Sequence, residues 1–356
     1  MNPSISSRRF GTLPDGREVQ LFSINLEGRL ELSVMDLGAT WTHLFAPDKN
    51  GEMSDLILGF DSLEGFLHPD YRENYCYMGS TIGRVAGRIR NNAFQLDGQT
   101  IHLPPNNLEG VHLHGGPEGW DRKLWQAEPF ETADTAGVTF YYQSPDGEGK
   151  YPGTIDIWVT YRLDASGRIE IQYKALSDRK TILNPTNHAY FNLSGNHQNP
   201  IEDHLFWVDA DQYLSIDAQS LPTGDMLSVE NTPFDFRTAK SLKEALSQDC
   251  LQLQLAGGID HTFVLNQAEN CAVLFHPESG RKLTLSTTEL GLQVYTSNYL
   301  DNKFKGKGGI AYGKRAGICL ETQHFPDSCN HPNFPSILLM PGEIFESKTQ
   351  FVLTAG

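Results

Sequence analysis

Hydrophobic and polar residues alternate with a period of two along much of this chain. Residues 155–161 read IDIWVTY and residues 169–174 read IEIQYK, so that Ile or another large apolar residue recurs at every second position. Successive side chains of a β-strand point to opposite faces of the sheet. Both segments are therefore predicted to be strands with one face buried.

Turn signals separate the alternating segments at short intervals. Pairs of a turn-favouring residue and glycine are typical of tight connections between antiparallel strands. They occur at Asp97-Gly98, Asp146-Gly147, Ser166-Gly167 and Pro341-Gly342. The pattern predicts antiparallel sheets joined by tight turns.

Helical spacing is convincing only at residues 239–248, where Leu242, Ala245 and Leu246 fall on one face. No repeat of fixed period, low-complexity tract or Pro/Ser-rich linker divides the chain. Large β-sandwiches can exceed about 200 residues as one domain. We therefore predict an all-β fold, a single large antiparallel β-sandwich over residues 1–356 with few short helices.

Composition narrows the classes of partner. The chain carries 44 acidic and 28 basic residues, a net charge of −16, which disfavours nucleic acid and anionic lipid and favours a neutral or cationic small molecule. No apolar stretch follows the two arginines of MNPSISSRRF, and no run approaches a membrane span. The five cysteines are widely spaced without a C-x-x-C pair. A cytoplasmic protein without disulfides, secretory signal or membrane anchor is expected.

Two histidines are the first candidates for chemistry. His112 and His114 lie two apart in VHLHGG, so a strand would present both on one face, as a metal pair requires. A metal site needs further ligands, and no histidine or glutamate elsewhere has matching spacing. The glycines that follow let a ligand approach the backbone. We therefore favour hydrogen bonding to a polar substrate and predict no metal.

Two glycine-rich segments allow more than one interpretation. Residues 308–314, GGIAYGK, fit the spacing of a phosphate loop, but Arg315 stands where Ser or Thr should bind magnesium and no helical pattern follows. An ordinary surface loop is expected there. In GSTIGRVAGRI, residues 79–89, Arg84 and Arg88 are either solvated arginines or donors to substrate hydroxyls.

Two further segments combine titratable groups with polar or buried surroundings. In NPTNHAYFNL, residues 184–193, His188 and Tyr190 share a face if the segment is extended, and three asparagines surround them. In GICLETQHFPD, Glu321 follows the apolar run ICL. A carboxylate at the end of a buried strand is either an ion-pair partner or an acid/base group whose pKa burial raises.

Taken together, segments along nearly the whole chain resemble the aldose 1-epimerase, or galactose mutarotase, family. Nine or so segments in the right order are more specific than any one of them. They are FGTLPDGREVQLFSI, DLILGFDSLEGF, GRVAGRI, LHGGPEGWDRKLW, SPDGEGKYPG, NPTNHAYFNLSG, GGIDHTFVL, GLQVYTSNYLD and ICLETQHFPDSCNHPNFPSILLMPGE.

This resemblance implies a β-supersandwich fold with a sugar site across a concave sheet face, and no metal or organic cofactor. It implies His188 as general acid and Glu321 as general base. Residues that it implies as ligands of sugar hydroxyls are Arg88, His114, Tyr190, Asp260 and Gln293. The family commonly has asparagine where this chain has Gly87, which leaves the chemistry untouched but opens the identity of the sugar.

The expected reaction interconverts the α and β anomers of a free aldose such as glucose or galactose. The expected partner is therefore a small-molecule sugar, and the enzyme is expected to be a monomer or a homodimer. Ring opening needs a base at the anomeric hydroxyl and an acid at the ring oxygen, which we expect on opposite sides of the substrate. Three alternatives stay open. They are an epimerase of phosphorylated hexoses, a silent sugar-binding module, and a glycosidase that uses Asp260 and Glu321 as its two carboxylates.

Overall fold

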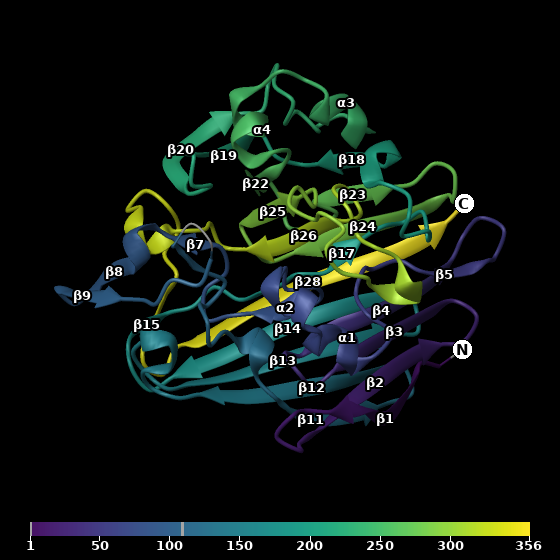
Figure 1. Ribbon diagram of the computed structural model, residues 1–356, viewed down its shortest axis with the longest axis horizontal. Coiled ribbons are helices and arrows are strands. Elements are labelled where there is room, and N and C mark those ends of the chain that lie inside the picture. The colour runs from purple at the N-terminus through teal and green to yellow at the C-terminus, as the bar shows by residue number, and fades with distance from the viewer. Residues whose placement is uncertain (1, 108–109) are drawn as a thin grey trace.

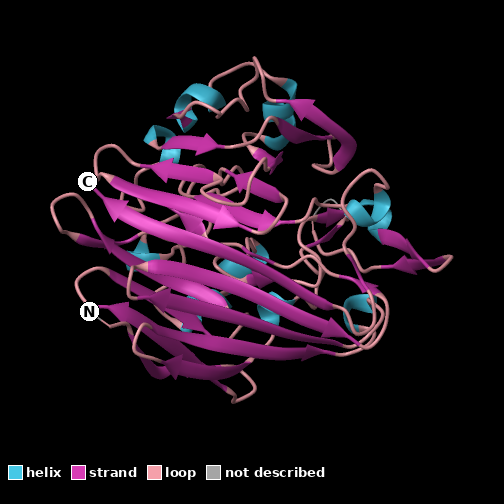
Figure 2. Ribbon diagram, turned by 180° about the vertical axis from the view of Figure 1, so that it is seen from behind, coloured by secondary structure: helices cyan, strands magenta, loops and turns pink. Residues whose placement is uncertain are grey.

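The computed structural model describes residues 2–107 and 110–356, and antiparallel sheets form most of it (Figure 1). A nine-stranded sheet is the largest, and Figure 2 shows its long strands side by side across the back of the molecule. In spatial order it contains β11 (Gln126–Glu131), β12 (Thr135–Ser144), β13 (Ile155–Asp164), β14 (Arg168–Ser177), β28 (Ile344–Ala355), β24 (Arg281–Thr287), β23 (Ala272–Phe275), β18 (Leu205–Val208) and β21 (Lys240–Ser241).

Two further sheets share a hydrophobic core with the nine-stranded sheet. The six-stranded sheet runs β17 (Tyr190–Phe191), β26 (Ile318–Gln323), β25 (Gly291–Tyr295), β22 (Asp260–Val264), β19 (Gln212–Ile216) and β20 (Pro222–Ser228). The five-stranded sheet runs β1 (Ser4–Thr12), β2 (Glu18–Leu26), β3 (Leu30–Met35), β4 (Thr40–Pro47) and β5 (Met53–Asp55). The ladders of the six-stranded sheet are all antiparallel.

Short elements complete the fold. Two-stranded pairs join β6 (Thr81–Ile82) to β16 (Thr186–Asn187), β7 (Arg88–Ile89) to β10 (His112–Leu113), β8 (Ala93–Leu96) to β9 (Gln99–His102), and β15 (Thr181–Ile182) to β27 (Leu338–Leu339). The α-helices are α1 (Leu63–Leu67), α2 (Pro69–Glu73), α3 (Leu242–Leu246) and α4 (Leu251–Ala256). Single 3₁₀ turns occur at Arg90–Asn92, Trp120–Arg122, Glu148–Lys150, Ile201–Asp203, Lys307–Gly309 and Ser328–Asn330.

The predicted strands are confirmed. Strands β13 and β14 contain the two alternating segments and pair with each other through the turn at Ser166-Gly167. Along β13, buried and half-buried residues alternate without interruption. The all-β class follows from this alternation, because one face of each long strand packs into the interior.

The core lies where the sheets meet. Trp41 of β4 is buried and packs edge-on against Tyr161 of β13, Phe191 of β17 and Phe351 of β28. This tryptophan of the five-stranded sheet therefore contacts strands of both the nine-stranded and the six-stranded sheets. Aromatic side chains of this size bury a large apolar area, which fixes the sheets against one another.

The α-helices of the described residues are short, and sequence periodicity indicated one of them. The predicted helix at 239–248 is confirmed as α3, but it begins only at Leu242, since residues 240–241 belong to β21. The Ser241 hydroxyl accepts a hydrogen bond from the Glu244 N–H at 3.1 Å and caps the helix. Within residues 2–107 and 110–356, no helix is long and apolar enough to cross a membrane.

Candidate active site

A cavity opens on one face of the six-stranded sheet, and all six strands of that sheet contribute to its wall. Residues two apart on one strand share a face, so β26, β25, β22 and β19 each supply a pair of lining residues. The opposite wall comes from residues 75–77, from β7 and from the segment around β10. The lining residues include all seven predicted site residues, namely Arg88, His114, His188, Tyr190, Asp260, Gln293 and Glu321.

His188 and Glu321 lie next to each other in this cavity. His188 Nε2 is 3.7 Å from Glu321 Oε1, and the two residues are only 5% and 2% exposed. Glu321 is on β26, and His188 lies two residues before the start of β17, which pairs with β26. Glu321 Oε2 has no hydrogen-bond partner among the residues that the structure describes. That oxygen is therefore available to a substrate proton.

Burial sets the protonation of this pair. It raises the pKa of Glu321 well above its ordinary value, and the nearby Asp260 carboxylate adds to the effect. It also lowers the pKa of His188 to about 4, because the charged imidazolium loses its hydration. Two adjacent groups of this kind titrate as a unit. Both shifts oppose charge on the two side chains.

A buried thiol orients the His188 ring. Cys319 Sγ lies 3.5 Å from His188 Nδ1, and burial keeps the pKa of Cys319 well above its ordinary value, so the group remains an uncharged thiol. This contact holds the ring so that its other nitrogen, Nε2, faces Glu321. Tyr190 stacks on the ring at 5.1 Å between centroids.

His114 is fixed by the backbone of Gly87. The Gly87 N–H donates to His114 Nδ1 at 3.2 Å, and the His114 N–H donates to the Gly87 carbonyl at 3.0 Å. Burial and the neighbouring His188 hold the pKa of His114 well below its usual range. His114 is therefore an uncharged ring whose Nε2 carries the proton, suited to donate to a hydroxyl.

A chain of side chains crosses the floor of the cavity. Thr262 Oγ1 donates to Gln293 Oε1, and Gln293 Nε2 donates to Asp260 Oδ1 at 2.7 Å. Arg88 Nη1 lies 3.8 Å from the other oxygen of Asp260. Burial raises the pKa of Asp260, and Arg88 opposes that rise. These contacts fix which atoms of Asp260 and Gln293 remain available to a ligand.

His112, the other histidine of the VHLHGG segment, is not among the residues that line the cavity. His112 does not share a face with His114, because the strand ends at Leu113 and His114 adopts a left-handed conformation with φ 51°. The His112 ring instead contacts the Pro104 carbonyl and the Tyr151 hydroxyl, each at 2.7 Å. The expected pair of histidines on one strand face is therefore wrong.

The two arginines of residues 79–89 have different roles. Arg84 is 2% exposed and donates to the Ser144 hydroxyl and to the carbonyls of Ser144, Pro145 and Pro152. It is neither a solvated arginine nor a substrate ligand, since its donors are used by the protein. Only Arg88 of this pair lines the cavity.

The asparagine side chains of residues 184–193 form hydrogen bonds with backbone groups of other segments. Asn184 bonds to His324, Asn187 bonds to the Gly79 carbonyl, and Asn192 bonds to the Asn199 and Ala316 carbonyls. The hydroxyl of Tyr190 donates to the Cys76 carbonyl at 2.9 Å. Tyr190 therefore offers the cavity mainly its ring.

The segment GGIAYGK is a loop, as predicted, and not a phosphate site. The Gly308 N–H donates to Asp61 Oδ2 at 2.8 Å, so that backbone donor is already used by a carboxylate. Residues 313–317 form no helix before β26 begins. Tyr312 of this loop is fully buried and packs near Phe304, which sequence analysis did not anticipate.

Two groups of side chains have the spacing of metal ligands. His114, His188 and Glu321 place one ligand atom each within 4.8 Å of the others. A histidine that binds a metal through one nitrogen normally donates its other N–H to an acceptor. Here His114 Nδ1 faces the Gly87 N–H, which is a donor and not an acceptor. This arrangement suits proton transfer better than metal binding.

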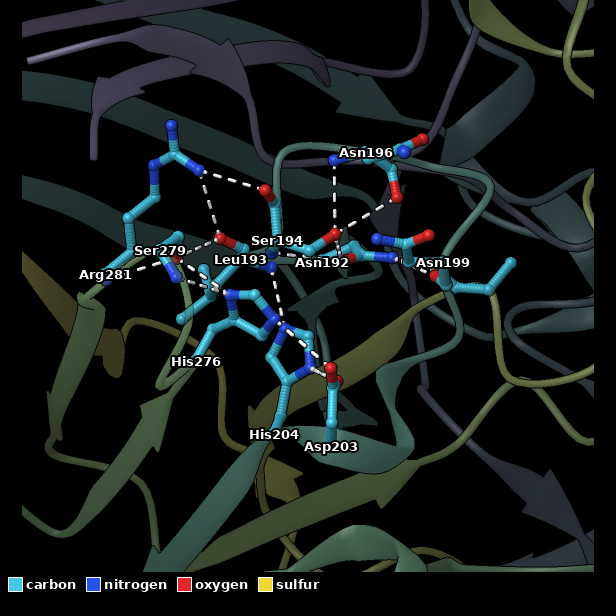
Figure 3. A network of polar contacts seen from close by, with 11 residues as sticks. Asn192, Leu193, Ser194, Asn196, Asn199, Asp203, His204, His276, Ser279 and Arg281 are labelled. Atoms are coloured by element: carbon cyan, nitrogen blue, oxygen red, sulfur yellow. Dashed lines mark hydrogen bonds and ion pairs between the residues drawn. The ribbon is translucent and has the colours of Figure 1, made fainter. Parts of the chain in front are cut away.

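The second group, Asp203, His204 and His276, lies in the polar network of Figure 3. The Leu193 N–H donates to His204 Nε2 at 2.9 Å, and the Ser279 N–H donates to His276 Nδ1 at 3.1 Å. The remaining nitrogens therefore carry protons and donate to Asp203, at 3.1 Å from His204 and 3.3 Å from His276. With protons on the atoms that face Asp203, this cluster is a hydrogen-bonded anchor for loops.

Some lining residues were not predicted. They include Thr262 and Gln323 and four tyrosines, Tyr75, Tyr77, Tyr295 and Tyr299. For three of them the signal was available, because Thr262, Tyr295 and Gln323 each stand two positions after a predicted residue on the same strand. Residues 75–77 reach the cavity from a loop, which no periodicity reveals.

Comparison with known proteins identifies the family of this chain. A model of the family described as aldose 1-epimerase matches residues 20–352. The galactose mutarotase of Homo sapiens is 41% identical over 352 residues, which cover 98% of both chains, and the aldose 1-epimerase of Haemophilus influenzae is 37% identical over 90% of this chain and 91% of its own.

Solved structures give the same picture. The galactose 1-epimerase of Lactobacillus acidophilus has a TM-score of 0.86 at 29% identity, with 99% of both chains covered. A GalM/aldose epimerase homologue from C. elegans has a TM-score of 0.83 at 30% identity, covering 92% of this chain and 97% of its own. The family match and the full-length relatives establish that this chain belongs to the aldose 1-epimerase family.

Proposed function

We propose that this protein interconverts the α and β anomers of free aldoses, with Glu321 as general base and His188 as general acid. One observation carries the proposal. Two buried titratable groups, 3.7 Å apart, line a cavity with hydrogen-bonding side chains. Ring opening needs one proton acceptor and one proton donor at the same time, and this pair supplies both.

The reaction starts with the pair ionised as carboxylate and imidazolium. Glu321 takes the proton of the anomeric hydroxyl while His188 Nε2 donates to the ring oxygen, and the ring C–O bond breaks to leave the open-chain aldehyde. Rotation about the adjacent C–C bond presents the other carbonyl face, and the two proton transfers then run in reverse. No nucleophile is required.

The geometry changes one expectation about this mechanism. We expected the acid and the base on opposite sides of the sugar, but His188 and Glu321 lie side by side. The hydroxyl oxygen and the ring oxygen are bonded to the same anomeric carbon. Neighbouring groups can therefore reach both oxygens from one edge of the sugar.

The proposal also covers the partner, the cellular compartment and the domain organisation of the protein. The names of the relatives indicate enzymes that act on sugars, and a small-molecule aldose is the proposed partner, without a cofactor. The five cysteines are free thiols, which fits a reducing cytoplasm. One core cluster includes residues from Phe22 to Phe351, which supports a single domain over residues 1–356. A monomer and a homodimer both remain compatible with the proposal.

The alternatives from the sequence analysis fit less well. Arg88 is the only lysine or arginine among the described lining residues, and Asp260 already pairs with it, so a phosphate would meet little positive charge. For a glycosidase, Asp260 would have to be a free second carboxylate, yet it bonds to Gln293 and faces Arg88. A silent binding module has no need of the proton-sharing pair.

Polarimetry tests the proposal. Freshly dissolved α-D-glucose, α-D-galactose and a pentose should equilibrate faster with wild-type protein than without it. Glu321→Gln and His188→Asn should each return the rate to near the spontaneous value, since each proton transfer supplies about 10²–10⁴-fold. No acceleration of any of the three sugars by wild type would contradict the proposal.

A further inference from the structure

Gln323 lines the cavity but has no role in the proposed mechanism. It follows Glu321 by two positions on β26, so its side chain lies on the same face of the sheet and lines the same cavity. Its partner across the ladder is Gly291 of β25, which has no side chain to cover it.

The amide of Gln323 is buried and unpartnered. The residue is 1% exposed, and neither its Oε1 nor its Nε2 has a hydrogen-bond partner among residues 2–107 and 110–356. A buried polar group without a partner destabilises the folded protein, so native structures rarely keep both ends of an amide in this state. A ligand that enters the cavity would satisfy both ends.

A second glutamine in the same cavity provides a contrast. Gln293 accepts from Thr262 and donates to Asp260, so the protein already uses both ends of its amide. Gln323 keeps both its donor and its acceptor for the contents of the cavity. A hydroxyl both donates and accepts hydrogen bonds, which makes it the natural partner of a free amide.

We propose that Gln323 binds a ring hydroxyl of the sugar other than the anomeric one, and this inference rests on the proposed function. Two residues along a strand span about 6.5–7 Å, so the Gln323 amide reaches a position well removed from the carbon at which Glu321 acts. Gln323 is thus a substrate-binding residue that determines which sugars fit, and it takes no part in proton transfer.

The test replaces the amide by an apolar group of similar size, Gln323→Leu. We expect kcat/KM for the preferred aldose to fall about tenfold or more, mainly through KM, because a hydroxyl would lose its partner in a buried site. The melting temperature of the sugar-free variant should equal or exceed that of wild type, since the unpartnered amide is gone. A structural role for Gln323 would lower it instead.

Monodeoxy sugars identify the hydroxyl. The 2-, 3-, 4- and 6-deoxy derivatives of the preferred aldose are compared with wild type and with Gln323→Leu. For one of them, the two proteins should have equal kcat/KM, because that sugar lacks the bound hydroxyl. An unchanged KM in the variant, or the same factor for every deoxy sugar, would overturn the inference.

A control separates this inference from the proposed function. Gln350→Leu makes the same substitution on β28, outside the cavity, where Gln350 Nε2 donates to Glu170 at 2.7 Å; it should leave KM unchanged. If wild type accelerates no sugar, the proposed function fails, and calorimetric titration with D-glucose then tests Gln323 by itself. Binding that Gln323→Leu does not weaken, or no binding at all, would overturn the inference as well.

Discussion

At the scale of single residues, the proposed mechanism depends on one proton shared by two buried groups. Burial opposes charge on either side chain, so it raises the pKa of Glu321 and lowers the pKa of His188 to about 4. The pair therefore takes up a second proton only near pH 4 and loses its last one only well above the ordinary range of a carboxylic acid. Between those limits it holds the single proton that catalysis needs.

This protonation predicts the pH profile of kcat/KM. The acid limb should lie near pH 4, more than two units below the ordinary value for histidine of about 6.5, because the free enzyme must lose the second proton there. Activity at pH 5 should thus remain close to that at pH 7. Polarimetric rates from pH 3.5 to 9, corrected for the spontaneous reaction, measure the profile. An acid limb near pH 6.5 would mean that the His188 ring is not desolvated.

Different sequence features pointed to Glu321 and to His188 as candidate site residues. Glu321 stands out because a carboxylate directly follows buried strand residues, and His188 because polar residues surround it. The asparagines near His188 are not part of its immediate polar surroundings as the sequence suggested. Their side chains instead donate hydrogen bonds to backbone carbonyls far away in the sequence. Sequence distance hides such partners. Their positions depend on how loops close over the sheets, which local periodicity does not encode.

At the scale of elements, the long strands were predictable, whereas α3 was the one short helix that the sequence pattern indicated among the described residues. A strand such as β13 repeats its pattern over ten residues, whereas α1, α2 and α3 have five residues each and α4 has six. A helix of five residues completes little more than one turn of 3.6 residues, so it shows little periodicity. Such elements form because their surroundings hold them.

The loop anchor around Asp203 gives a prediction at this scale. Its carboxylate accepts hydrogen bonds from His204 and His276, and the His204 bond is the main reason that the pKa of Asp203 falls to about 2. Asp203→Ala should lower the free energy of unfolding at pH 7 by about 1 kcal/mol, since the partly exposed carboxylate gains less than a buried one. Urea denaturation measures this change, with the exposed Asp134→Ala as control.

The sign of the pH dependence follows from the lowered pKa. Asp203 stabilises the folded state above the ordinary aspartate pKa of 3.8 and loses that contribution as the pH falls toward 2. The difference between wild type and Asp203→Ala should shrink over this window. A melting temperature that rises with added Zn²⁺ in wild type but not in the variant would instead identify a metal site and contradict the hydrogen-bonded anchor.

At the scale of the whole molecule, the net charge of −16 separates neutral from charged substrates. The field of a strongly acidic protein slows the approach of anions and leaves neutral sugars unaffected, and salt screens this field over about 10 Å at 0.1 M. We therefore expect kcat/KM for a neutral aldose to stay constant within about twofold between 0.01 and 0.3 M NaCl.

The corresponding hexose 6-phosphate should behave differently. It should react more slowly than the neutral sugar at low salt and gain as salt rises, because it meets both the overall negative charge and a cavity whose one arginine faces Asp260. Polarimetry of matched neutral and phosphorylated sugars across the salt series measures both trends. A phosphorylated sugar that reacts faster at low salt would mean that local positive charge outweighs the field of the molecule, and it would favour the phosphosugar alternative over free aldoses.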